Sequence, residues 1–154
     1  MSPIKMSENI LQTAITKEEM TRSFYLKVSE KVSNPTVKEP LQQMAKEEQK
    51  HKDLLLARLR DEYGSEFVPQ DFSGDEKYRV AEQEITSHEH ALVVIRSAME
   101  LEDEAINFYT SQLDKVDHPD DQELLGELID FEEGHRSWLE KEYKNMSTSS
   151  HWLP

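Results

Sequence analysis

The sequence predicts an all-α protein, namely a four-helix bundle with one long crossover that is built from a duplicated helical hairpin. Only four Gly and six Pro occur among the 154 residues, which favours long regular helices. Apolar residues recur at alternating steps of three and four along four segments, a pattern typical of a bundle seam. A pattern of Glu, Phe-Tyr and Glu-x-x-His occurs twice, with a constant shift of 84 residues and no gap.

The first hairpin is predicted from two helices, over residues 7–33 and 36–63. Ser7 can cap the first helix, because its hydroxyl can accept a hydrogen bond from a free backbone N–H of the first turn. Thr36 and Glu39 have the spacing of a capping box at the start of the second helix.

Residues 64–86 are predicted to form the long crossover. Gly64 is a plausible helix stop, and the segment is too long for a tight turn between helices. Twenty-odd extended residues, at about 3.3 Å each, can run the length of a helix of about 39 Å. The crossover would therefore return the chain along the bundle.

The second hairpin is predicted from helices over residues 87–116 and 121–145, with capping boxes at Thr86/Glu89 and Asp120/Glu123. Residues 1–146 would form one bundle domain. Residues 147–154 are polar apart from Trp152 and Leu153, which predicts a flexible C-terminal tail.

The repeat includes apolar and hinge positions as well as polar ones. Besides the Glu, His and Phe-Tyr positions, the pairs Ala14/Ala98, Pro35/Pro119, Leu41/Leu125 and Leu55/Leu139 are identical at the same shift. We infer a duplicated hairpin whose halves are related by a pseudo-two-fold axis.

Four Glu and two His of the repeat lie at seam positions that should be apolar. An unpaired buried carboxylate costs several kcal/mol or takes up a proton, whereas two divalent cations would balance four carboxylates. The Glu-x-x-His spacing puts both side chains of each pair on one helix face. The predicted metal ligands are Glu18, Glu48, His51, Glu102, Glu132 and His135.

Roles within this set follow from position. Glu48 and Glu132 can bridge two ions, whereas Glu18 and Glu102 can each bind one ion. Tyr25 and Tyr109 follow the latter two by seven residues and suit hydrogen bonds to ligands rather than ligation. The repeat also predicts equivalent roles for the two His ligands.

The other His and the acids beside the ligands are predicted to lie at the surface. His88 and His90 are near a helix start, where capping is the expected role, whereas His118 lies in a turn and His151 in the tail. Four acids next to the ligands project to other helix faces and are expected to be exposed; they are Glu19, Glu47, Asp103 and Glu133.

Composition excludes several classes of function. The absence of Cys rules out disulfides, thiolate zinc sites and iron–sulfur clusters on this chain. The net charge of −14 argues against binding to nucleic acid. No apolar run has the length of a membrane span or resembles a signal peptide, so a cytoplasmic protein is expected.

The motifs Glu18-x-x-Thr-x-x-Phe-Tyr25, Glu48-x-x-His51, Glu102-x-x-Ala-x-x-Phe-Tyr109 and Glu132-x-x-His135 resemble those of the rubrerythrin family, in the ferritin-like superfamily. The resemblance covers about residues 10–140. It implies a ferritin-like four-helix bundle with two iron ions per chain, redox chemistry with peroxide or O₂, and a homodimer.

Two features depart from that family. Rubrerythrins usually carry a rubredoxin domain that supplies electrons, and this chain has no Cys to build one, so a separate rubredoxin-like donor is expected. They also tend to have a further Glu one turn after the ligand of the third helix, where this chain has Ala105.

Three classes of function stay open at this point. The first is an oxidoreductase that reduces peroxide or O₂, and the second is a ferroxidase or iron-storage protein. The third is a metal-binding bundle without turnover. The ligand types also suit Mn²⁺ and Zn²⁺, so the residues do not identify the metal.

Overall fold

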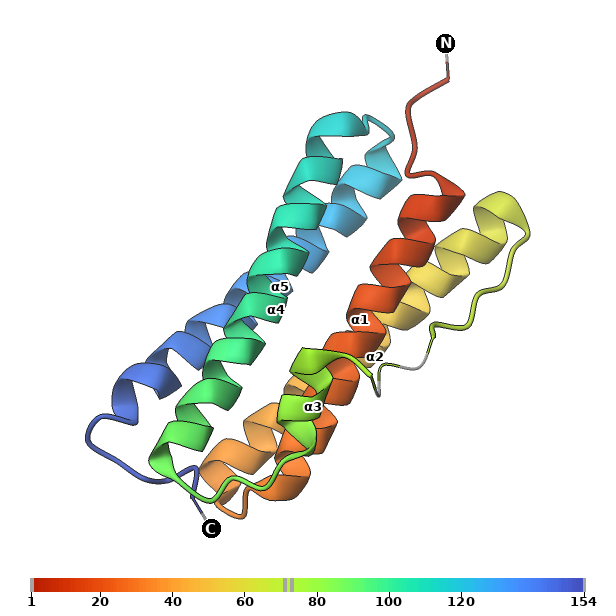
Figure 1. The fold of residues 1–154 in the computed structure, drawn as a ribbon. Helices are drawn as coiled ribbons and strands as arrows, with labels where there is room; N and C mark the ends of the chain where they lie inside the picture. The colour runs from red at the N-terminus through yellow and green to blue at the C-terminus, as the bar shows by residue number, and fades with distance from the viewer. Residues whose placement is uncertain (1, 71, 73, 154) are drawn as a thin grey trace.

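The protein is described here from a computed structural model, which covers residues 2–70, 72 and 74–153. Within these residues the chain forms five helices and no strand, which confirms the predicted all-α fold. The first two helices pack as one antiparallel hairpin and the last two as another (Figure 1). The helices are α1 (Glu8–Lys31), α2 (Pro35–Tyr63), α3 (Glu76–Glu82), α4 (His88–Lys115) and α5 (Pro119–Asn145).

The second helix of each hairpin begins one residue before the predicted capping box. Helix α2 begins at Pro35 and α5 at Pro119, and each Pro suits the first helical position because its missing N–H has no partner there. The residues before them, Asn34 and His118, cap the helices by accepting a hydrogen bond from the backbone N–H two residues on. Helix α4 is capped by Ser87 rather than by its predecessor.

The crossover leaves α2 where predicted and contains a short helix that was not predicted. Gly64 adopts the left-handed conformation, with φ of 62°, and its N–H donates to the carbonyl of Arg60. Helix α3 is capped by Asp75 and contacts both α1 and α4 (Figure 1). Its Ala81 is buried, so the crossover covers one side of the bundle with apolar surface.

Two apolar clusters fill opposite ends of the bundle. One joins the end of α1 to the starts of α2 and α4, around Tyr25, Leu41 and Ile95. The other joins the start of α1 to the ends of α2 and α4, around Leu11 and Leu59. The predicted ligands lie between these clusters in sequence on every long helix, so the fold places a polar layer between two apolar ones.

Residues 151–153 pack against the bundle, unlike the flexible tail that the sequence predicts for residues 147–154, of which residue 154 lies outside the described residues. Trp152 is 1% exposed and lies in the first apolar cluster, with its ring centroid 6.2 Å from that of Trp138. His151 Nε2 lies 3.2 Å from a carboxylate oxygen of Glu142. A large aromatic side chain buries enough apolar surface to hold an otherwise polar segment.

In the described part of the chain, no helix is both long enough and apolar enough to cross a membrane.

Candidate metal centre

Helices α1, α2, α4 and α5 bring all six predicted ligands into one buried layer. The fractional exposure of these side chains is 1% or less, except for His135 at 5%. Burial of this kind is rare for charged groups unless they are paired or bind a metal.

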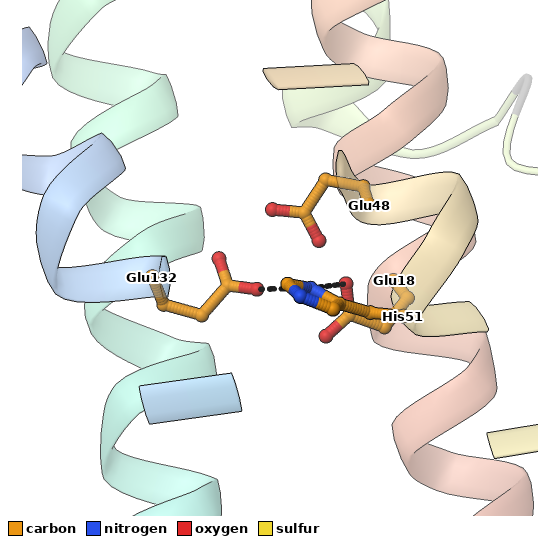
Figure 2. Close-up of side chains that lie close together, drawn as sticks. All are labelled: Glu18, Glu48, His51 and Glu132. Carbon is orange, nitrogen blue, oxygen red and sulfur yellow. Dashed lines mark ion pairs between the residues drawn. The ribbon is translucent and has the colours of Figure 1, made fainter. Parts of the chain in front are cut away.

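The first of two overlapping groups joins both hairpins. It consists of Glu18, Glu48, His51 and Glu132, with one ligand atom from each residue within 4.8 Å of the others. The Nδ1 atom of His51 is 3.9 Å from a carboxylate oxygen of Glu18 and 3.9 Å from one of Glu132 (Figure 2). The side chains converge on one point from α1, α2 and α5.

The second group consists of Glu48, Glu102, Glu132 and His135. The Nδ1 atom of His135 lies 3.0 Å from Glu48, 3.5 Å from Glu102 and 3.7 Å from Glu132, measured to carboxylate oxygens. Glu48 and Glu132 belong to both groups, in the places that the sequence predicts for bridging ligands. Ligation itself stays a prediction.

Many polar side-chain atoms of the buried layer have no hydrogen-bond partner among the described residues. Within the described residues, eight buried side-chain nitrogen or oxygen atoms have no partner, and seven of them belong to the predicted ligands. These seven include both nitrogens of His51 and both carboxylate oxygens of Glu132. Carboxylate oxygens and imidazole nitrogens are suitable donors for Fe²⁺, Mn²⁺ and Zn²⁺, so the residues fit a metal pair.

Without a metal, burial and mutual repulsion disfavour the ionised form of the carboxyl groups in this layer. Burial raises the pKa of Glu48 well above its ordinary value of 4.5, and the charge of Glu132 raises it further. Burial and the charge of Glu102 raise the pKa of Glu132 in the same direction. Burial lowers the pKa of His51 to about 4. Burial would also lower the pKa of His135, but the three carboxylates that face its ring, Glu102, Glu132 and Glu48, outweigh burial and raise that pKa.

The two tyrosines connect the hairpins. Tyr25 on α1 donates a hydrogen bond to Glu102 on α4, and Tyr109 on α4 donates one of 2.6 Å to Glu18 on α1. Each therefore bonds to a Glu of the opposite hairpin, a pairing that the spacing along one helix does not reveal. Burial raises the pKa of both hydroxyls, which keeps them protonated as donors.

Of the four acids beside the ligands that were predicted to be exposed, one is exposed and the others are partly or largely buried. Glu133 is exposed, and Asp103 is half-exposed and pairs with Arg136. The Glu19 side chain, in contrast, is largely buried between two cations, Arg22 and Lys52. A long side chain lying along the helix surface can reach a partner that its backbone position does not face.

Glu47 is the residue that sequence reasoning missed. Its Oε2 atom lies 2.5 Å from Nε2 of His135, on the side of the ring away from the other carboxylates. The sequence does contain a sign of this difference, because the repeat is broken here. The residue 84 positions after Glu47 is Phe131 rather than an acid. That ring packs edge-on against His51, with centroids 4.8 Å apart. The two His ligands therefore have different surroundings, against the predicted equivalence.

The other His lie outside this layer. His88 and His90 are exposed at the start of α4, and His118 caps α5, while His151 contacts the end of that helix.

Comparison with known proteins places the chain in a family. The sequence profile of the rubrerythrin family matches residues 9–143. Among solved structures, the fold is similar to that of a hypothetical protein from Pyrococcus furiosus, with a TM-score of 0.76 and 26% sequence identity, over 96% of this chain and 92% of that chain. No curated protein matches the sequence significantly. The fold and the buried layer define a ferritin-like bundle with a carboxylate and histidine site. The chain belongs to the rubrerythrin family.

Proposed function

We propose that the buried layer binds two iron ions and that the protein is a non-haem di-iron oxidoreductase, which reduces peroxide or O₂ with electrons from a separate donor. One observation carries the proposal: seven of the eight unpartnered buried atoms of the described residues lie on five of the six predicted ligands. Such a cluster is costly for a protein to bury without a cation. Family membership supports iron as the metal.

The proposed roles follow the two groups of side chains. Glu18 and His51 would bind one ion, Glu102 and His135 the other, and the two Glu shared by both groups would bridge them. The tyrosine hydroxyls would hold the two non-bridging carboxylates in place through the bonds that connect the hairpins.

When bound, a pair of ferrous ions would supply the two electrons that, with two protons, convert hydrogen peroxide to two waters. The chain itself buries the site and limits the approach of water. A cavity of about 500 Å³ between α2 and α5 is lined by His135 and Glu47, so small solutes can reach one edge of the layer. Since the chain has no Cys, we propose a rubredoxin-like protein as the electron donor.

Iron uptake tests the first half of the proposal. Metal-free protein treated with excess Fe²⁺ under anaerobic conditions, then freed of unbound iron, should hold two iron ions per chain by elemental analysis. His51→Ala and His135→Ala should each lower that number, because each removes the nitrogen ligand of one position. The double variant His88→Ala/His90→Ala is the matched control and should retain two. Wild-type protein without iron would contradict the proposal.

Reaction with oxidants tests the second half. One equivalent of peroxide added to the ferrous protein should oxidise the site once in stopped flow, and O₂ should be compared at matched concentration. Further turnover should require an added rubredoxin with its reductase. If neither oxidant reacts, the protein is a binding bundle without turnover.

A second candidate, iron oxidation for storage or delivery, is favoured by one observation. Ala105 lies one turn after Glu102 and is 4% exposed within an apolar cluster, so the site keeps a symmetric set of six ligands. The mass of the assembly and its iron content separate the two candidates. A homodimer with two iron ions per chain supports the oxidoreductase, whereas a large shell with many iron ions per chain supports storage.

A further inference from the structure

Glu47 lies beside the predicted ligands without belonging to either group that converges on a metal position. It directly precedes Glu48 on α2, and its carboxylate reaches across to His135 on α5, with 2.5 Å between Oε2 and Nε2. The Glu47 side chain is 26% exposed, whereas that of His135 is 5% exposed. Glu47 therefore contacts the site from its solvent side.

The two nitrogens of the His135 ring face different carboxylates. Nδ1 faces three carboxylates of the buried layer, at 3.0, 3.5 and 3.7 Å, which is where a shared cation would lie. Of the carboxylates in the described part of the chain, Nε2 contacts only that of Glu47. A neutral imidazole has one N–H and one lone pair, so a proton held on Nε2 by the Glu47 carboxylate leaves the Nδ1 lone pair directed into the layer.

Among the described residues, the other His has no such partner. Both nitrogens of His51 are buried without a hydrogen bond to these residues, and its ring packs against Phe131, the residue that occupies the position equivalent to Glu47. A carboxylate that accepts a hydrogen bond from a ligating His orients the ring and makes it a stronger ligand. Only one of the two His has that support.

We propose that Glu47 is a positioning residue that holds His135 as an Nδ1 ligand, so that the metal position at Glu102 and His135 binds its ion more tightly than the position at Glu18 and His51. The inference rests on the proposed two-metal site. It adds that the position at Glu102 and His135 takes up its ion before the other position does. The site would be nearly symmetric in its ligands but unequal in affinity.

Titration with Zn²⁺, which has no redox chemistry, tests this without any measurement of turnover. Metal-free wild-type protein followed by calorimetry should show two binding steps of different affinity. Glu47→Ala should weaken the tighter step by about 10- to 100-fold and leave the other unchanged. Glu47→Gln should have a smaller effect, because the amide oxygen can still accept the Nε2 proton. Glu133→Gln removes an exposed acid beside a ligand and should match wild type.

A second measurement reports on the His135 ring directly and begins with the wild type. Long-range proton–nitrogen NMR spectra of the zinc-loaded wild type should show one ring with the proton on Nε2 and the metal on Nδ1, and Glu47→Ala should remove this assignment. Glu47 lines an open cavity, so the substitution leaves no sealed void and the fold should persist.

Different results overturn different statements. If wild type takes up two Zn²⁺ and Glu47→Ala titrates identically, or weakens both steps equally, the role of Glu47 is wrong and the two-metal site stands. If wild type binds no Zn²⁺, the proposed site and the inference both fail.

Discussion

Replacing Glu132 by Gln should stabilise the metal-free protein at pH 7, although it removes a predicted bridging ligand. Glu132 is 1% exposed, and burial together with the nearby charge of Glu102 raises its pKa well above 4.5. A carboxyl group with a raised pKa contributes stability below its unfolded pKa and loses it as the pH rises through the folded pKa. Gln keeps the shape of the protonated acid and has no proton to lose.

The size of this stabilisation follows from the ordinary pKa of the Glu132 carboxyl group, which is 4.5. Because burial and the charge of Glu102 raise that pKa, the folded protein keeps a proton that the unfolded chain releases above its ordinary pKa. Each pH unit above 4.5 then costs at most about 1.36 kcal/mol. The cost is at most about 3.4 kcal/mol at pH 7 and about 0.7 kcal/mol at pH 5. The stability of Glu132→Gln relative to wild type should therefore rise by up to about 2.7 kcal/mol between pH 5 and pH 7.

Urea denaturation of both proteins in the presence of a chelator, at pH 5, 6 and 7, measures this difference in the free energy of unfolding. His51, whose lowered pKa destabilises the fold as the pH falls, titrates in both proteins, and the main cause of its shift, burial, is the same in both. Glu133→Gln, at an exposed neighbour, should show no pH-dependent difference from wild type. A Glu132→Gln effect that is the same at pH 5 and pH 7 would refute the reasoning.

Two further changes test the interior of the bundle, one at a hydrogen bond to a predicted ligand and the other in an apolar cluster. Tyr109→Phe keeps the buried ring but removes the bond to Glu18, whose other oxygen has no partner, so the free energy of unfolding of the metal-free protein should fall by about 1.5–3 kcal/mol in urea. An unchanged midpoint would mean that water replaces the hydroxyl. Trp152→Ala should cost about 3–5 kcal/mol, because the side chain fills the end of an apolar cluster. A variant as stable as wild type would show that the C-terminal segment does not pack in solution.

Much of the site was predictable because the duplication removes ambiguity. A single Glu-x-x-His is a weak signal in an acidic sequence, but two copies at one shift, each on an apolar seam, indicated the six side chains that the structure brings together. The capping boxes at Thr36 and Asp120 were wrong because local hydrogen-bonding patterns compete, and Pro at the first helical position favoured the earlier start.

The sequence by itself determined the helical hairpins, their duplication and the polar layer, since each depends on periodicity along one chain. Only the tertiary structure decided which groups meet across helices. Tyr25 and Tyr109 bond to the opposite hairpin, Glu47 bonds to His135 but has Phe131 as its counterpart, and Trp152 packs in the core. The physical reason is that spacing fixes the face on which a side chain lies, whereas the partner of a long side chain depends on how separate helices pack.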